Sequence, residues 1–176
     1  MNDFKLNKDK TIAALLYICN ELGGAWDLYS LLKILYFAEQ KHLVRYGRPI
    51  TGDDIIALPH GPVNSWAYDL LKPAKLDPNY FEVLENDVIS CKQKPDLDEL
   101  SQSDIKCLQE SIKENKDLGF GQLKRKSHDQ SYEYTIKNIG RNSKIPFIEI
   151  AKAAGANEEL IKYILVNMEN EYLSLK

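Results

Sequence analysis

The sequence predicts a mainly α-helical protein with a small β-hairpin element, folded as a compact multi-helix domain around one buried central helix. Three observations support this fold class. Residues 28–46 have apolar side chains at spacings of three and four on most sides, which is typical of a helix that other elements surround. Residues 80–84 and 88–91 are short apolar runs separated by turn residues, which predicts a hairpin. The length of 176 residues suits one domain.

The composition excludes several classes of protein. Hydrophobic residues make up 44% and charged residues 28% of the chain, so a folded core is expected. The net charge of −3 argues against a protein that coats nucleic acid over its whole surface, although one basic patch stays open. The cysteines have no metal-type spacing, and we find neither a leader nor a run of about 18 apolar residues. We therefore expect a cytoplasmic protein with reduced thiols and no membrane partner.

The first two helices are marked by their ends. Residues 8–22 keep helical apolar spacing, and two glycines follow them. The central helix has Asp27 as its N-cap and Gly47 after its last residue, because glycine adopts a left-handed backbone at little cost. Its narrow polar side is expected to face solvent, with His42 at the surface or its boundary. That side consists of Lys33, Glu39, Gln40 and Lys41.

The segment after the central helix has turn chemistry. Residues 51–54 predict either a short hairpin or an irregular loop with solvated carboxylates. Pro59 and Pro62 exclude helix around His60, so we expect a structural turn there. Pro62 then suits the first turn of a third helix over 63–71.

The second half of the chain is again helical. A fourth helix starts at Ser101, with Asp104 three residues later in the position of a capping box. Residues 119–121 interrupt it, and residues 122–128 form a short fifth helix. Two further helices are expected, one from Pro146 to Gly155 and one over 158–173 with Asn157 as its N-cap.

Two blocks of the sequence resemble one protein family. The first block is LLKILYFAEQKHLVRYGRPI over 31–50, followed by ALPHGPV over 57–63. The second is LSQSDIKCLQESIKENKDLGFGQLKRKSH over 100–128, which ends in Ser-His. In this order and at this separation they resemble the two signatures of the Panacea domain, found in the phage-associated SocA-like or GepA-like antitoxins. One departure is Tyr132, which stands where the family often has a tryptophan.

The resemblance implies an antitoxin of a toxin–antitoxin system. In this family the domain, here residues 1–136, binds and neutralises a cognate toxin protein encoded beside it. One member instead delivers its toxin to a protease, so a Clp-type machine is a second implied partner. Residues 137–176 follow the family less clearly, and we expect them to form a C-terminal helical extension packed on the same domain.

We expect the central helix and the turn after it to form a scaffold, with the toxin bound on the surface beside them. Aromatic and arginine side chains dominate the binding energy of protein interfaces, although the same aromatics would also suit a core. The basic residues 124–126 fit an acidic protein, nucleic acid or a simple solvent-facing helix. The predicted contacts are Tyr36, Arg45, Tyr46, Arg48, His60, Trp66, Lys124, Arg125, His128 and Tyr132. The predicted structural residues are Gly47, Pro49, Gly61, Pro62, Val63 and Ser127.

His60 and the Ser127-His128 pair are the residues most suggestive of catalysis. His60 has the right titration range, but nothing near it in sequence supplies a second catalytic group. Neighbouring residues on a helix point about 100° apart, so His128 is poorly placed to activate Ser127, and a local hydrogen-bonding role is expected. We find no metal-ligand spacing. We therefore predict no enzymatic activity, no catalytic residues, no metal and no cofactor.

Residues 148–164 leave one alternative open. A helix, a glycine turn and a second helix at this spacing resemble a helix-turn-helix, which would make the protein a DNA-binding regulator of its own operator. The second helix has Lys162 as its only cation beside Glu158 and Glu159, whereas a helix that faces DNA should be more basic. Ordinary helical packing is favoured, and operator DNA stays the second candidate partner.

Overall fold

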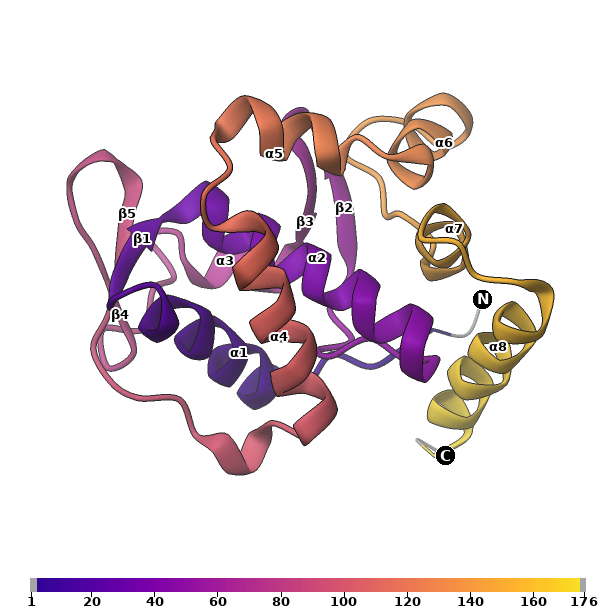
Figure 1. Cartoon of the computed structure of the whole chain (residues 1–176), viewed down its shortest axis with the longest axis horizontal. Coiled ribbons are helices and arrows are strands. Elements are labelled where there is room, and N and C mark those ends of the chain that lie inside the picture. The colour runs from indigo at the N-terminus through magenta and orange to yellow at the C-terminus, as the bar shows by residue number, and fades with distance from the viewer. Residues whose placement is uncertain (1–2, 175–176) are drawn as a thin grey trace.

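The computed structural model describes residues 3–174 of the chain. These residues form eight α-helices and two small antiparallel sheets (Figure 1). This is the predicted mainly α fold with a small β element. The helices are α1 (Lys8–Glu21), α2 (Leu28–Tyr46), α3 (Ser65–Leu70), α4 (Gln102–Asn115), α5 (Phe120–Ser127), α6 (Gln130–Asn138), α7 (Phe147–Ala153) and α8 (Glu158–Leu173). The strands are β1 (Ala25–Asp27), β2 (Ile55–Leu58), β3 (Gly61–Asn64), β4 (Phe81–Val83) and β5 (Val88–Cys91), with 3₁₀ turns at Glu85–Asp87 and Leu97–Glu99.

α2 is the central helix, and it begins and ends as predicted. The Asp27 carboxylate accepts a hydrogen bond from the Ser30 amide at 2.8 Å. Gly47 follows the last turn with a φ of +70°, and its amide donates to the Leu43 carbonyl. A Cβ at Gly47 would lie 2.4 Å from the ring of Tyr163, so the approach of α8 adds a second reason for glycine at this position.

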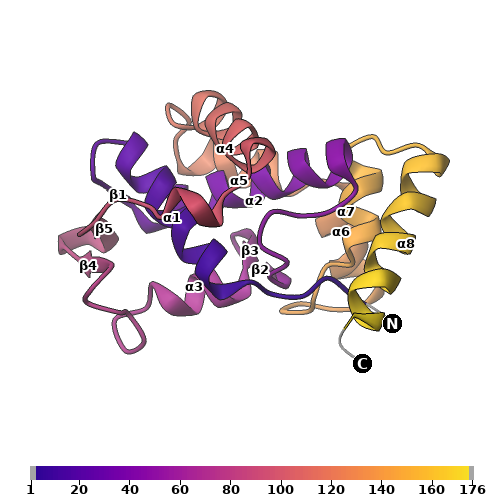
Figure 2. The ribbon, with the colours of Figure 1, turned by 90° about the horizontal axis from the view of Figure 1, so that it is seen from below.

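One hydrophobic cluster lies on each side of α2. The first joins α2 to α1, α3, α4 and the three-stranded sheet, and it takes Leu31 and Ile34 from α2. The second joins α2 to β2 and to α5–α8, and it takes Tyr36 and Leu43 from α2. In Figure 2, α2 runs between these two groups of elements. α2 therefore contributes apolar side chains to both clusters, which is why the helix is apolar on most sides.

The three-stranded sheet has the order β1-β5-β4, and all its pairs are antiparallel. β4 and β5 are the two predicted strands. β1 is an addition that was not predicted from the sequence. Trp26 lies opposite Ile89 of β5.

α4 begins with the predicted capping box. The Ser101 hydroxyl accepts a hydrogen bond from the Asp104 amide at 3.2 Å, and the Asp104 carboxylate accepts one from the Ser101 amide at 2.8 Å. In the middle of the helix, the Ser111 hydroxyl donates to the Ile34 carbonyl at 2.6 Å. This bond ties α4 to the centre of α2, beneath the solvent-facing side of α4.

The third helix begins later than predicted, because residues 61–64 form β3 and pair with β2. Asn64 lies opposite Ile55, and Pro62 lies opposite Ala57. The Ala57 amide donates to the Ser143 carbonyl instead of across the hairpin, so this pairing needs no amide hydrogen from Pro62. α3 then starts at residue 65, and its first amides, Trp66 and Ala67, each donate to the Asp53 carboxylate at 3.0 Å. Asp53 is therefore buried, which corrects the expected solvated loop acid.

α6 was not predicted. Its N-cap is Asp129, whose carboxylate accepts hydrogen bonds from the Ser131 and Tyr132 amides at 3.0 and 3.1 Å. The helix runs to Asn138 and so crosses the predicted boundary at residue 136. The division into a domain and an extension stays a prediction, although α7 and α8 share the second cluster with α2.

Candidate functional site

The two sequence blocks meet at Gly61. Its φ is +108°, and a Cβ placed there would lie 2.4 Å from Ser127 Oγ, 3.0 Å from Lys33 Nζ and 3.3 Å from His128 Cδ2. Lys33 belongs to the first block, whereas Ser127 and His128 end the second. Both the backbone conformation and the crowding select glycine at this position, as predicted for a structural residue of the turn.

Lys33 is fully buried, which corrects the expectation that it faces solvent. Its Nζ donates a hydrogen bond to the Pro62 carbonyl at 2.6 Å and lies 5.0 Å from the centre of the Tyr29 ring. Among residues 3–174, no carboxylate oxygen lies within 4.0 Å of this nitrogen. Burial therefore lowers the pKa of Lys33 from 10.5 to about 7, so the amine and ammonium forms are nearly balanced at neutral pH.

A cavity of about 490 Å³, here called the Lys33 cavity, lies beside this side chain. Its walls come from the start of α2, the tip of the β2–β3 hairpin, Tyr68 of α3 and the turn before β5. At its edge the Tyr29 hydroxyl donates to the His60 carbonyl at 2.8 Å. The Phe120 ring packs on both, at 4.5 Å from the Tyr29 ring and 5.3 Å from the His60 ring. These three side chains form an aromatic rim, of which Phe120 is 51% exposed.

Ser127 and His128 stabilise the end of α5 and do not form a catalytic pair. The Ser127 hydroxyl donates to the Lys124 carbonyl at 3.0 Å, one turn back in the helix. His128 is the C-cap of α5, and its ring stacks on Tyr132 with centres 4.2 Å apart. Burial and the nearby charges of Lys124 and Lys33 lower the pKa of His128, so the ring stays neutral at neutral pH. The Ser127 hydrogen bond is the kind of local contact expected of the pair, and the partner contact predicted for His128 stays a prediction.

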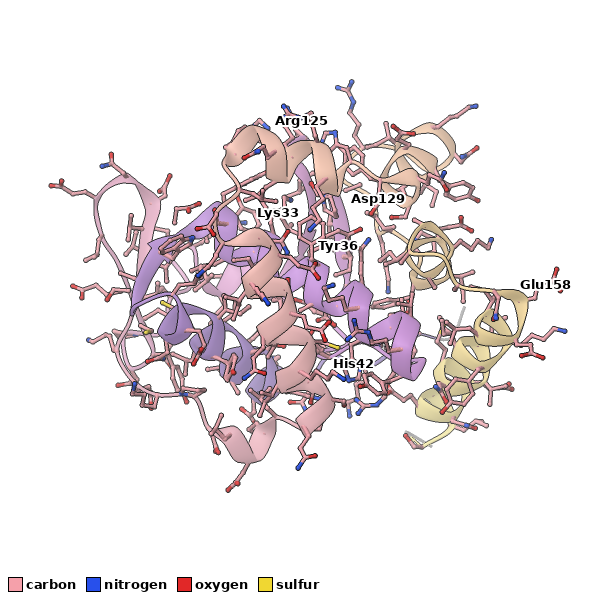
Figure 3. The ribbon with its side chains drawn as sticks, viewed as in Figure 1. Lys33, Tyr36, His42, Arg125, Asp129 and Glu158 are labelled. Atoms are coloured by element: carbon pink, nitrogen blue, oxygen red, sulfur yellow. The ribbon has the colours of Figure 1, made fainter. Side chains whose placement is uncertain are left out.

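Tyr36 lies next to this junction on α2 but has no exposed surface, so the prediction that it contacts a partner is wrong. Its hydroxyl donates to Asp129 Oδ2 at 2.8 Å, and the Gln40 amide donates to the same oxygen at 2.7 Å. Figure 3 shows Tyr36 and Asp129 together, below α5. The Asp129 carboxylate thus joins the centre of α2 to the start of α6.

Glu39 is also buried, contrary to the expected solvent-facing side of α2. Its carboxylate accepts hydrogen bonds from the Ile50 amide at 2.5 Å, from the Thr51 amide and hydroxyl, and from the Asn64 side chain at 3.1 Å. Burial nevertheless raises the pKa of Glu39 to about 7. One carboxylate therefore holds the loop after α2 and the end of β3 against the helix.

His42, expected at the surface or its boundary, is buried as well. Its Nδ1 lies 2.7 Å from the Arg48 carbonyl, which can only accept, so Nδ1 carries the hydrogen. Nε2 lies 2.9 Å from the Ser103 hydroxyl and 3.1 Å from Asp104 Oδ1. Lys33, Tyr36 and His42 follow one another along α2 in Figure 3, so the helix carries a row of buried polar groups.

The predicted contacts do not form one patch. Arg45 and Tyr46 are exposed at the C-terminal end of α2, where Arg45 pairs with Glu110 at 2.6 Å. A helix of 19 residues is about 28 Å long, so these side chains lie far from His60 at the other end. Arg48 lines a separate cavity of about 570 Å³ beside the start of α1. Trp66 is half-buried beneath Lys8, whose Nζ lies 5.8 Å from the ring centre.

Of the remaining predicted contacts, His60 lines the Lys33 cavity. Lys124 is half-buried and Arg125 is exposed on α5. Tyr132 is 8% exposed, and its hydroxyl donates to the Leu58 carbonyl at 2.9 Å, so it braces the hairpin and offers little surface. His60 is exposed at the hairpin tip.

Three members of the site were not predicted from the sequence: Lys33, Tyr29 and Phe120. A lysine inside the apolar run LLKILY was the one available signal, because a cation there has apolar neighbours on both sides. Phe120 lay between two glycines that were read as an interruption. In the structure Phe120 is the first residue of α5.

Chemically, the site can hold a partner group but shows no set of reacting groups. The Ser127 hydroxyl is engaged with a carbonyl, and the His128 ring faces Tyr132. Within residues 3–174, no cluster of three or more His, Cys, Asp or Glu side chains is placed to bind a metal. In the same span, none of the helices combines the length and apolarity required to cross a membrane.

A domain with this α-helical fold and this junction between two separated blocks belongs to a known class. The family model of the SocA-like antitoxins, the Panacea domain, matches residues 31–133, which is more than half of the chain. The protein therefore belongs to the family of SocA-like antitoxins with a Panacea domain. No curated protein and no solved structure matches the chain.

Proposed function

We propose that the protein is the antitoxin of a toxin–antitoxin pair and that it neutralises its toxin by direct contact at the aromatic rim and the mouth of the Lys33 cavity. One observation carries this proposal. The two blocks that define the family converge at Gly61, next to His60, whose ring packs against the exposed ring of Phe120. Exposed aromatic side chains beside a preformed cavity are typical of the centre of a protein interface.

The supports of this face favour binding by a rigid surface. The hairpin tip is held by the Tyr29–His60 hydrogen bond and by the Tyr132–Leu58 hydrogen bond on its other side. A surface that is already ordered loses little conformational entropy when a partner binds.

The test is growth rescue followed by purification. The product of each reading frame adjacent to the gene is expressed alone and then together with this chain. We expect one product to stop growth, and we expect this chain to restore growth and to co-purify with that product. If no adjacent product is both toxic and rescued, the proposed function is wrong.

Two variants with matched exposure sharpen the test. Phe120→Ala removes one ring of the rim, whereas Tyr134→Ala removes an aromatic side chain of similar exposure, 43% against 51%, from α6. Rescue should fail or weaken for Phe120→Ala and persist for Tyr134→Ala. Binding of the two purified proteins in the absence of any protease separates direct neutralisation from delivery to a Clp-type machine.

DNA binding receives no support from the C-terminal helices. Tyr163, Leu165 and Val166 of α8 are 54%, 48% and 51% exposed, so much of the outer surface of the proposed reading helix is apolar. DNA backbones are bound by cationic surfaces. Operator DNA therefore stays an untested alternative.

A further inference from the structure

Lys33 differs from the buried carboxylates in residues 3–174, because most of its hydrogen-bonding capacity has no partner within hydrogen-bond distance among these residues. Asp104 pairs with Lys10 at 2.7 Å, and Asp53 accepts two amide hydrogen bonds. Glu39 accepts bonds from Ile50, Thr51 and Asn64. The Lys33 ammonium has three hydrogens, and the Pro62 carbonyl takes one of them.

The position of Lys33 indicates which kind of group could pair with its ammonium. The side chain and Gly61 both line the Lys33 cavity, whose other walls include Leu32, Leu58 and Val63. Two carboxylates, Asp27 and Asp87, also line the cavity, but neither lies within 4.0 Å of Lys33 Nζ. Asp27 is already engaged as the N-cap of α2. The cavity thus has an apolar wall, a cation at one end and aromatic rings at its edge.

We propose that the Lys33 cavity receives an acidic side chain of the toxin, whose carboxylate pairs with Lys33 while the aromatic rim covers the residues next to it. This inference rests on the proposed function and names the chemistry of its partner. Lys33 itself has no exposed surface, so its side chain turns from the Pro62 carbonyl toward the cavity when the carboxylate enters. A lysine stem is flexible enough for this change.

The charged side chains that line the cavity are Lys33, Asp27 and Asp87, so among the described lining residues Lys33 is the group that can pair with an incoming carboxylate. Burial is the main cause that lowers the pKa of His128; the charges of Lys124 and Lys33 add to this effect, and those of Glu133 and Asp129 oppose it. The Tyr29 ring of the same helix lies 5.0 Å from Lys33 Nζ, and Ser127 and His128 lie with Lys33 around Gly61. A carboxylate that enters would raise the pKa of Lys33 toward its usual value, so binding should weaken as the pH rises above neutrality.

The melting temperature of a Lys33 variant distinguishes a role of Lys33 in binding the toxin from a role in stabilising the fold. A buried cation without a counter-ion is costly, so an apolar side chain of similar length should be tolerated at this position. If Lys33 serves the fold, Lys33→Met must lower the melting temperature. If it serves the partner, Lys33→Met leaves the melting temperature unchanged or raises it, and the toxin is lost.

The experiment compares wild type, Lys33→Met and Lys41→Met with the toxin found by rescue. Lys41 is a lysine of the same helix in a surface pair with Glu114 at 2.7 Å, so it controls for the loss of one charge. We expect Lys33→Met to melt at or above the wild-type temperature and to bind the toxin at least about 30-fold more weakly, because it leaves a buried carboxylate unpaired. Lys41→Met should bind within about twofold of wild type.

The toxin supplies the second half of the test. Each Asp and Glu of the toxin is changed to Asn or Gln, and one such change should reproduce the loss and add nothing further in Lys33→Met. The inference is overturned, with the proposed function intact, if Lys33→Met neutralises the toxin as well as wild type or melts well below it. It is also overturned if no single amide change couples to Lys33.

A probe that does not depend on the toxin completes the design. Wild type and Lys33→Met labelled with ¹³C at lysine Cε are titrated with N-acetylglutamate, and the Lys33 resonance is followed. A shift in wild type that tracks the toxin result supports the inference. If wild type binds N-acetylglutamate but no adjacent gene product, the cavity is a site for small carboxylates and the docking inference is wrong. Binding of neither probe also overturns it.

Discussion

Replacing Gly61 with alanine should lower the free energy of unfolding more than the same change at another left-handed glycine. The φ of +108° strains any side chain, and the new Cβ would lie 2.4 Å from Ser127 Oγ. The backbone conformation should cost about 1–2 kcal/mol, and overpacking should cost about 1–3 kcal/mol more. Gly155 has a φ of +90° and no atom within 4 Å of such a Cβ, so Gly155→Ala measures the backbone cost alone.

Urea unfolding followed by circular dichroism measures both losses, and melting gives a second value. In a protein of this size each kcal/mol lowers the melting temperature by about 2–4 °C, so a loss of about 2–5 kcal/mol corresponds to about 4–20 °C. Ser127→Ala removes the nearest atom, so the double variant should lose less stability than the two single variants together. Equal losses for Gly61→Ala and Gly155→Ala, or additive losses at Gly61 and Ser127, would refute the reasoning.

Three further predictions concern Lys33, the aromatic rim and the start of α6. Because burial lowers the pKa of Lys33 from 10.5 to about 7, the unfolded chain holds a proton between these values that the folded chain has released. The contribution of Lys33 to the free energy of unfolding is fully present above 10.5, its pKa in the unfolded chain. This contribution is lost as the pH falls through about 7, its pKa in the folded chain. Wild type should therefore gain about 1.4 kcal/mol per pH unit relative to Lys33→Met between about pH 7.5 and 9, and parallel stability curves would contradict this. Phe120→Ala should change stability by less than about 0.5 kcal/mol but weaken toxin binding in calorimetry by about 1–2 kcal/mol, and an unchanged affinity would remove Phe120 from the interface. Asp129→Ala should lower the free energy of unfolding by about 1 kcal/mol because the N-cap of α6 is lost. It should lower it by about 1–3 kcal/mol more because the buried Tyr36 hydroxyl loses its acceptor. A loss well under about 1 kcal/mol in urea unfolding would show that this network contributes little.

The ends of the main helices were predictable because their signals are local. Asp27 and Gly47 mark α2 within one residue of its ends, and Ser101 with Asp104 marks α4. In each case the capping group and the amide that it bonds lie within four residues of each other. Local patterns of this kind do not depend on the rest of the fold.

The polar core was not predictable from local pattern. Charged residues on a helix normally indicate its solvent side, and by that rule Lys33 and Glu39 were expected to be exposed. Their partners, the Pro62 carbonyl and the Asn64 side chain, lie on β3, more than twenty residues further along the chain. Only the folded hairpin brings these groups to α2, so nothing near either residue indicated burial.

Residues 61–64 show a local signal that a tertiary contact overrides. Pro62 would fit the first turn of a helix, and this is a sound local interpretation. The segment instead pairs with β2, whose other edge meets residues 142–145. A strand partner from so late in the chain has no counterpart in the local sequence, and the same distance hid the contribution of Phe120 to the site.

The position of α2 between two hydrophobic clusters has a consequence for how the protein unfolds when part of the chain is lost. Loss of α7 and α8 would remove apolar members of the cluster that contains Phe37 and Leu43 of α2. Loss of α1 would do the same in the cluster that contains Leu31 and Ile34 of the same helix. Either loss affects one shared element, so a fragment cut after residue 136 should unfold at a much lower temperature than the whole chain.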